Sequence, residues 1–169
     1  DVPEGETLVG VKEIVTKHWE KYGRHFYCRY DYEGVDSDAA NEVMDLIRNS
    51  FVDGDITSAP DDDSGIKLVD AVEFAYTDPV DGSQTSKQGL ILNFEYPESA
   101  GGGTARVVFR LSGTGSAGAT IRMYLEKFER DASKHGEAAP SALKELADRA
   151  LGLVRMEELT GRDAPTVIT

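Results

Sequence analysis

Apolar residues recur at intervals of three and four in three parts of the chain, which is the spacing of a half-buried α-helix. This pattern predicts helices over residues 8–22, 37–51 and 140–154. Trp19 lies on the apolar side of the first helix, and we expect it to pack into the core. Gly23 is placed to end the first helix, and Asp36 or Ser37 to cap the second. The third helix would begin at Pro140 or Ser141.

Between the second and third helices the hydrophobic period shortens to two, which is typical of strands with one buried face. Residues 26–32 also alternate and indicate a strand or an extended link. Residues 52–65 are rich in Asp, Ser, Gly and Pro and predict a surface loop, whereas residues 160–169 show no period. The predicted strand faces are Val72, Phe74 and Tyr76; Leu90, Leu92, Phe94 and Tyr96; Ala105, Val107, Phe109 and Leu111; and Ile121, Met123 and Leu125.

Strands joined by short turns and flanked by helices predict an α+β fold, in which an antiparallel sheet of about four strands carries helices on one face. A chain of 169 residues is long enough for one such domain with its own core. We therefore expect a single domain over residues 1–169. Residues 1–35 would form an N-terminal helix and a link, and residues 36–169 the α+β core and the tail.

The composition is that of an ordinary globular protein, with 40% hydrophobic and 29% charged residues. The formal net charge of −13 opposes binding to nucleic acid or to anionic membranes, which normally requires a basic surface. No apolar run approaches the roughly 20 residues of a membrane-spanning helix, and no signal or transit peptide is visible. Because the first residue is Asp1, we expect a fragment or a processed product.

A single cysteine, Cys28, excludes an intrachain disulfide and fits a reducing cytoplasm. Its spacing from His18, His25 and His135 does not match a metal site, and no basic partner marks it as a nucleophile. We expect the histidines to be surface or packing residues. We expect residues 61–63, three consecutive aspartates, to form a solvated acidic loop rather than a cation site.

The clearest candidate for chemistry is the run Arg-Leu-Ser-Gly-Thr-Gly-Ser-Ala-Gly-Ala-Thr-Ile-Arg over residues 110–122. Leu111 and Ile121 are expected to face the core. Arg110 and Arg122 must then point to the other face, opposite or diagonal to each other if the strands pair as a hairpin. Two positive charges so close together destabilise a sheet unless an anion lies between them. Glycine amides, hydroxyls and two guanidinium groups together predict a phosphate site.

The competing interpretation is a flexible hairpin whose arginines pair with nearby carboxylates, and residue types alone leave both interpretations open. The run matches neither the dinucleotide-binding fingerprint nor the P-loop, so the sequence does not indicate a nucleotide site. Any anion bound by so acidic a chain must be captured by a local arrangement of charge.

Several motifs outside this run are shared with one known family. In order, they are His18-Trp19, Tyr22-Gly23-Arg24-His25, Arg29-Tyr30-Asp31-Tyr32-Glu33, Asp78-Pro79-Val80-Asp81-Gly82-Ser83, Thr160-Gly161-Arg162 and Ala164-Pro165-Thr166-Val167-Ile168-Thr169. Together with residues 110–122 they resemble the fourth, phosphate-binding C-terminal domain of the phosphoglucomutases, in the α-D-phosphohexomutase superfamily. The resemblance covers nearly the whole chain. It implies the TATA-box-binding-protein-like fold of that domain, with a link from the preceding domain in residues 1–35.

The resemblance implies an enzyme that interconverts glucose 1-phosphate and glucose 6-phosphate through a phosphoserine and a glucose 1,6-bisphosphate intermediate. In such enzymes the fourth domain holds the phosphate at the non-reacting end of the sugar. Carried over by motif, Arg29 is a candidate for the cleft or the domain interface. The residues implied for the phosphate grip are Arg110, Ser112, Gly113, Thr114, Gly115, Ser116 and Arg122.

Three functional segments of that family are absent from this sequence: the Thr-Ala-Ser-His segment of the phosphoserine, the Asp-Gly-Asp-Gly-Asp type of run for Mg²⁺, and the sugar-recognising Gly-Glu-Glu-Ser segment. The resemblance therefore implies a fragment that is not catalytic alone and binds no cofactor itself, while Mg²⁺ and glucose 1,6-bisphosphate belong to the whole enzyme. Its expected partners are sugar phosphates and the preceding domains, in the cytoplasm. The alternative is a non-catalytic adhesion or signalling relative with the same fold.

Overall fold

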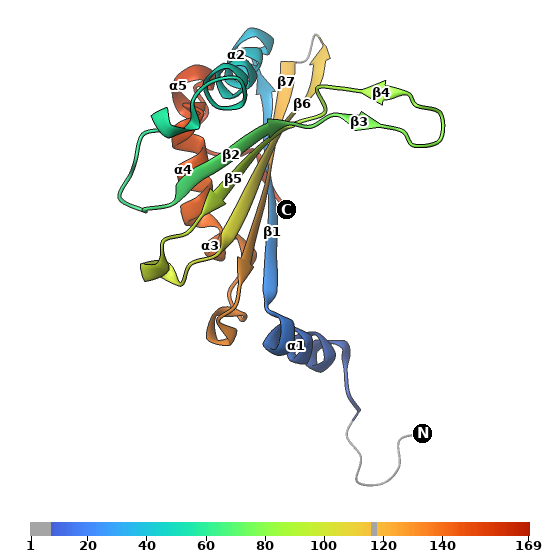
Figure 1. The fold of residues 1–169 in the computed structure, drawn as a ribbon, viewed down its shortest axis with the longest axis vertical. Helices are drawn as coiled ribbons and strands as arrows, with labels where there is room; N and C mark the ends of the chain where they lie inside the picture. The colour runs from blue at the N-terminus through green and yellow to red at the C-terminus, as the bar shows by residue number, and fades with distance from the viewer. Residues whose placement is uncertain (1–7, 116–117) are drawn as a thin grey trace.

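A six-stranded antiparallel sheet forms the centre of the computed structural model, which describes residues 8–115 and 118–169. Its strands follow the order β2-β5-β6-β7-β1-β8 (Figure 1). The predicted α+β class is confirmed, but about four strands is too few, because residues 24–35, where a strand or an extended link was predicted, and residues 167–168 also form strands of the sheet. The bounds are β1 Arg24–Val35, β2 Lys67–Glu73, β5 Leu90–Glu95, β6 Thr104–Gly115, β7 Gly118–Glu129 and β8 Val167–Ile168.

Helices cover one face of this sheet, where α2, α4 and α5 lie side by side in Figure 1. The opposite face, here called the open face, carries side chains that include Tyr27, Asn93, Arg106, Arg110 and Glu126. The α-helices are α1 Val11–Tyr22, α2 Ser37–Ile47, α3 Ala139–Ala142, α4 Lys144–Leu153 and α5 Met156–Thr160; a wider π turn spans Arg48–Val52, and single 3₁₀ turns span Ile56–Ser58, Glu98–Ala100 and Ala132–Lys134.

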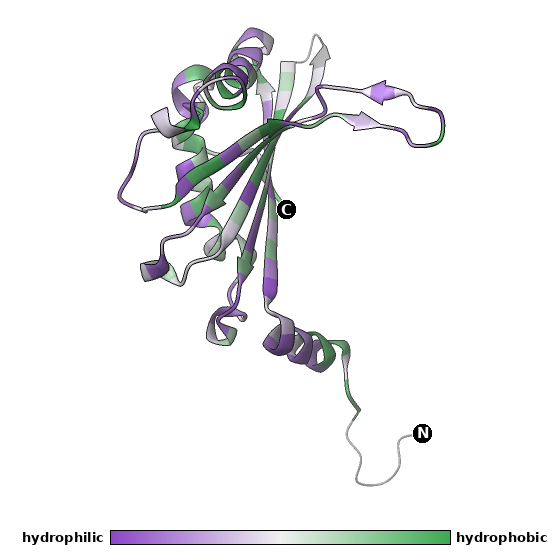
Figure 2. Ribbon diagram, viewed as in Figure 1, coloured by the Kyte–Doolittle hydropathy of each residue, from purple (hydrophilic) through white to green (hydrophobic). Residues whose placement is uncertain are grey.

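The core lies between the sheet and these helices, and bands of alternating hydropathy follow the strands in Figure 2. Helix α2 begins where the sequence indicated, because the Asp36 carboxylate accepts hydrogen bonds from the main-chain N–H groups of Asp38 and Ala39. The predicted inward faces of β5, β6 and β7 are confirmed, with their fully buried members being Leu90, Leu92, Phe94, Val107, Phe109, Ile121 and Met123.

The predicted strand face of Val72, Phe74 and Tyr76 is wrong, because all three side chains are exposed. Strand β2 ends at Glu73, and its buried side chains are Leu68 and Ala71. The chain then leaves the sheet and forms a separate two-stranded arm, which projects from the sheet in Figure 1. The arm consists of β3 Tyr76–Thr77 and β4 Gln84–Thr85, and the predicted turn 78–83 joins them.

Helix α1 has the predicted bounds near its C-terminal end, but it buries none of its residues. The expectation that Trp19 packs into the core is therefore wrong. Trp19 is half-buried, and the guanidinium group of Arg24 lies 4.2 Å from its ring centroid. In Figure 1, α1 stands at the end of the sheet opposite the end of β6 and the start of β7.

The C-terminal residues form β8 although they show no hydrophobic period, because main-chain hydrogen bonds pair them with β1. The N–H of Thr169 donates to the carbonyl of Arg29 at 3.0 Å, and the N–H of Arg29 donates back at 2.7 Å. The N–H of Thr166 donates to the carbonyl of Asp31 at 2.7 Å. This pairing fixes the backbone of Arg29 and Asp31 on the side of β1 away from β7.

Candidate functional site

Strands β6 and β7 pair so that Arg110 and Arg122 are direct Cα partners. Their neighbours Phe109 and Ile121 are fully buried under the helices, so both arginines project from the open face, as the sequence predicted. Within the described residues no ion pair involves Arg110, whereas Arg122 lies near one carboxylate, that of Asp31. Two cations therefore face each other across β6 and β7 at the end of the sheet, and the one carboxylate near them, Asp31, lies on the far side of Arg122 on β1.

The main chain beyond this pair turns through left-handed conformations that only glycine adopts without strain. Gly113 has φ +66° and Gly118 has φ +88°. An added Cβ at Gly113 would meet open space, whereas one at Gly118 would lie 3.0 Å from the carbonyl oxygen of Val35. The register of β6 against β7 shifts between the pairs Ser112–Thr120 and Gly115–Gly118, and Thr114 lies within that shift. Ser116 is outside the described residues.

Asp31 is buried on the open face between two arginines, on the side of the sheet away from α2, α4 and α5. It is 4% exposed and is the direct Cα partner of Arg122 across β1 and β7. Its Oδ1 lies 2.9 Å from Nε of Arg29, and its Oδ2 lies 3.9 Å from Nε of Arg122. Both contacts are ion pairs by distance, but neither Nε–H is aligned as a hydrogen bond to a described residue.

The structure thus brings Arg29, the candidate for the cleft or interface, to the same carboxylate as Arg122. Sequence reasoning did not single out Asp31. The available signal was the spacing of Arg29 and Asp31, which places both side chains on one face of the predicted strand.

A hollow of about 330 Å³ adjoins Arg110 at the edge where β5 begins. Arg48, Lys87 and Arg110 contribute three cationic side chains to it. Arg48 is paired with Glu73 at 2.7 Å, and this hydrogen bond lowers the pKa of the Glu73 carboxyl below its usual range. Asp45, at 2.7 Å from Arg48, also contributes to the lining. The hollow is large enough for a small ligand and is bordered by positive charge on the side of Arg110.

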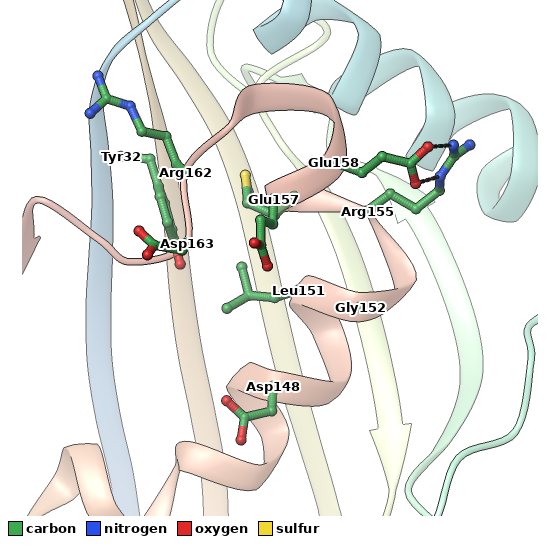
Figure 3. Close-up of a pocket in the computed structure, with 10 residues that line it drawn as sticks. Tyr32, Asp148, Leu151, Gly152, Arg155, Glu157, Glu158, Arg162 and Asp163 are labelled. Carbon is green, nitrogen blue, oxygen red and sulfur yellow. Dashed lines mark hydrogen bonds and ion pairs between the residues drawn. The ribbon is translucent and has the colours of Figure 1, made fainter.

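A larger hollow, of about 660 Å³, lies elsewhere, between α4, α5 and β1 (Figure 3). Asp148, Glu157 and Asp163 make its lining acidic, which disfavours phosphate. The Arg155 guanidinium group on its rim is already bound to the Glu158 carboxylate, as Figure 3 shows. This hollow therefore does not compete with the β6–β7 site for an anion.

Cys28 and the three histidines are buried or contact other side chains or main-chain groups of the protein. Cys28 is 6% exposed, and burial raises the pKa of its thiol, which makes the thiolate scarce. His25 contacts the Glu126 carboxylate at 3.0 Å. His135 is buried with Nε2 at 3.0 Å from a main-chain carbonyl, and the His18 ring contacts Tyr22.

Across residues 8–115 and 118–169, no group of three or more His, Cys, Asp or Glu side chains is arranged to hold a metal ion. In the loop of residues 61–63, the Asp62 carboxylate accepts hydrogen bonds from Ser64. None of the helices in the same part of the chain has the length and apolar character that crossing a bilayer requires.

Comparison with known families gives a match over residues 24–166 to the family described as phosphoglucomutase-1, C-terminal domain. A cytoplasmic phosphoglucomutase of Bromus inermis is 49% identical over 168 residues, which are 98% of this chain and 28% of that protein. A chloroplastic phosphoglucomutase of Solanum tuberosum is 47% identical over 169 residues, which are 100% of this chain and 25% of that protein.

A solved structure is also similar. It is the open form of the exocytosis-sensitive phosphoprotein pp63/parafusin, a phosphoglucomutase from Paramecium, with a TM-score of 0.75 and 37% identity. The match covers 98% of this chain and 26% of that protein. This chain therefore spans about a quarter of the length of the proteins to which it is similar.

Proposed function

The chain belongs to the family of phosphoglucomutase C-terminal domains, and from that membership we propose that its β6–β7 hairpin grips the non-reacting phosphate of a sugar phosphate. The proposed ligands are glucose 1-phosphate, glucose 6-phosphate and glucose 1,6-bisphosphate. The residues of the grip are Arg110, Ser112, Gly113, Thr114, Gly115, Ser116 and Arg122.

The observation that carries this proposal is the direct pairing of Arg110 with Arg122 on the open face. Two guanidinium groups held in register repel each other, and a phosphate between them removes the repulsion while accepting planar pairs of hydrogen bonds from each. The left-handed Gly113 next to them frees the main chain to turn its amides toward the same anion. The competing interpretation, arginines consumed by carboxylates, fits Arg110 poorly because no described carboxylate pairs with it.

The whole enzyme would interconvert glucose 1-phosphate and glucose 6-phosphate, with phosphoserine, Mg²⁺ and sugar recognition supplied by the preceding domains. A distal grip contributes orientation, which accelerates a reaction only when the reacting groups are present. In this proposal the share of this chain in the work is binding. We place the enzyme in the cytoplasm, as for several named relatives, although one relative is chloroplastic.

The second candidate is a non-catalytic relative used for adhesion or signalling. The relatives quoted above are named phosphoglucomutases, which favours the enzyme. The sequence that precedes this domain in its parent protein separates the two. A phosphoserine segment and a metal-binding run there support catalysis, and their loss supports the alternative.

The test is kinetic and uses the full-length enzyme. Arg110→Ala and Arg122→Ala each remove charge-assisted hydrogen bonds of about 1.5–3 kcal/mol, so kcat/KM should fall by roughly 10-fold to 150-fold. Arg106→Ala is the matched control, because Arg106 lies on the same strand and face but pairs with Glu126. Unchanged kcat/KM in both loop variants would remove the proposed role of the hairpin.

A second measurement uses this chain alone, labelled with ¹⁵N and titrated with glucose 6-phosphate. We expect weak binding, at about millimolar Kd or roughly −4 kcal/mol, because only one end of the ligand is held. The amide signals of residues 113–116 should shift first. Shifts that begin instead around Asp148 and Asp163 would move the ligand to the acidic hollow.

A further inference from the structure

A buried carboxylate is costly unless cations compensate it, yet Asp31 is almost fully buried on the side of the sheet away from α2, α4 and α5. Two arginines flank it, Arg29 along β1 and Arg122 across on β7. The backbone of β1 is bonded to β7 on one edge and to β8 on the other at this point. The sheet therefore fixes where the Asp31 carboxylate stands, while both arginine side chains remain about 40% exposed.

The two arginines of the proposed grip are consequently unequal. Arg110 has no carboxylate partner among the described residues, and Arg122 has one at 3.9 Å. That distance is too long for a directional hydrogen bond, and Nε of Arg122 is buried without an aligned acceptor in the described part of the chain. The contact therefore restrains Arg122 by charge without consuming its hydrogen-bonding groups, which is what a phosphate ligand would require of it.

We propose that Asp31 is a positioning residue, which holds the Arg122 guanidinium group in register with Arg110 so that both can bind one phosphate. Arg29 on the other side of the carboxylate limits how closely Asp31 can draw Arg122 in, because it takes the shorter contact of 2.9 Å. The inference rests on the proposed function of the hairpin and assigns that site a third element, strand β1.

The opposite role is also physically possible in principle, since a carboxylate near an anion site repels the anion. The two roles predict opposite changes in phosphate binding when the charge of Asp31 is removed. If Asp31 positions Arg122, removal of its charge weakens phosphate binding. If Asp31 only repels, removal strengthens it.

The experiment measures glucose 1-phosphate kinetics in the full-length enzyme with Asp31→Asn, which keeps the size of the side chain and removes its charge. We expect KM to rise about 10-fold with kcat changed less than about 3-fold, because the grip acts in both ground and transition states. Glu126→Gln is the matched control: it removes a carboxylate from the same face, four residues along β7 from Arg122, and should leave KM unchanged.

A double-mutant cycle separates positioning from general structural damage. In an Arg122→Ala background, Asp31→Asn should have no further effect on KM, since Asp31 acts through Arg122. An equal loss in both backgrounds, or a lower KM in the Asp31→Asn enzyme, overturns the inference. If the Asn variant does not fold, Asp31→Thr removes the same charge with a side chain suited to a strand.

The outcomes also separate this inference from the function on which it rests. A large loss from Arg110→Ala and Arg122→Ala together with no loss from Asp31→Asn rejects the inference and keeps the grip. No loss from the two arginine variants rejects the grip itself.

Discussion

Arg149 of helix α4 donates a hydrogen bond from Nε to the main-chain carbonyl of Ile66, at 3.0 Å. Its Nη2 donates to the carbonyl of Pro60 at 2.6 Å, and the Asp62 carboxylate lies 3.6 Å from Nε. Arg149 is 6% exposed, so one buried cation ties the acidic loop of residues 52–65 to the helical layer. The loop is polar in sequence, but this cation anchors it to the fold.

Arg149→Met should therefore destabilise the chain by about 2–4 kcal/mol, because it removes the donors to two carbonyls and takes away a buried cation that also lies near the partly exposed Asp62 carboxylate. Urea denaturation measures the loss. The control is Lys144→Met, which removes a solvent-exposed pair with Asp148 on the same helix and should cost about 0.5 kcal/mol. Equal unfolding midpoints for the two variants would contradict the anchoring role.

The two left-handed glycines of the hairpin should differ in their tolerance of a side chain. Gly113→Ala should cost about 1 kcal/mol from backbone conformation alone, since an added Cβ meets open space. Gly118→Ala should cost at least about 2 kcal/mol, because its Cβ would also press on the carbonyl of Val35. Denaturation midpoints of the two variants decide this, and a Gly118→Ala protein as stable as Gly113→Ala would refute it.

Cys28 should make stability depend on pH in the alkaline range. Burial raises the pKa of its thiol above the unfolded value of about 8.5. The unfolded chain therefore loses this proton first, and the stabilisation that is complete below the unfolded pKa declines as the pH rises toward the folded pKa. Between pH 8 and 9.5, as a rough window, the urea midpoint should fall less in Cys28→Ala than in the parent chain.

The burial of Cys28 can also be tested by chemical labelling of its thiol. Cys28 should react with a thiol reagent only as the chain unfolds, and the reaction should follow the urea transition. Rapid labelling of the native protein would show that the strand opens at Cys28 and would remove the basis for the pH prediction.

Helix α1 should contribute almost nothing to the stability of this chain by itself. Ile14→Asp should change the free energy of unfolding by less than about 0.5 kcal/mol, because Ile14 is 58% exposed. The matched control is Val43→Asp on α2, where a fully buried side chain is replaced and a loss above about 4 kcal/mol is expected. A large effect of Ile14→Asp would mean that α1 packs on this domain.

The same placement of α1 predicts the behaviour of the single tryptophan. Trp19 fluorescence should be quenched readily by acrylamide in the native chain, since the ring is only half-buried under Arg24. Quenching as slow as that of a core tryptophan would contradict the placement of Trp19 outside the core.

Local rules made much of the fold predictable. Asp36 capped α2 as expected because a cap needs only the N–H groups of the next turn. Strands β5, β6 and β7 buried the expected side chains because alternation is a property of the extended backbone. Each of these features depends on neighbours within a few residues.

The wrong predictions concern segments whose local pattern does not show which other part of the protein packs against them. The period of two continues through Phe74 and Tyr76, but the chain leaves the sheet there, so nothing covers those side chains. The apolar stripe of α1 is real, yet none of its residues is fully buried, and Trp19 is covered only in part, by Arg24. Strand β8 was missed because two residues held by main-chain bonds need no hydrophobic period.

By itself the sequence determined that Arg110 and Arg122 share one face at the end of a hairpin, because side-chain alternation and a glycine-rich turn are written in consecutive residues. Only the tertiary structure decided that Asp31 stands beside Arg122, since β1 and β7 are distant in sequence and meet through the order of the sheet. Charges far apart along the chain interact strongly only when strand pairing brings them within a few ångströms of each other.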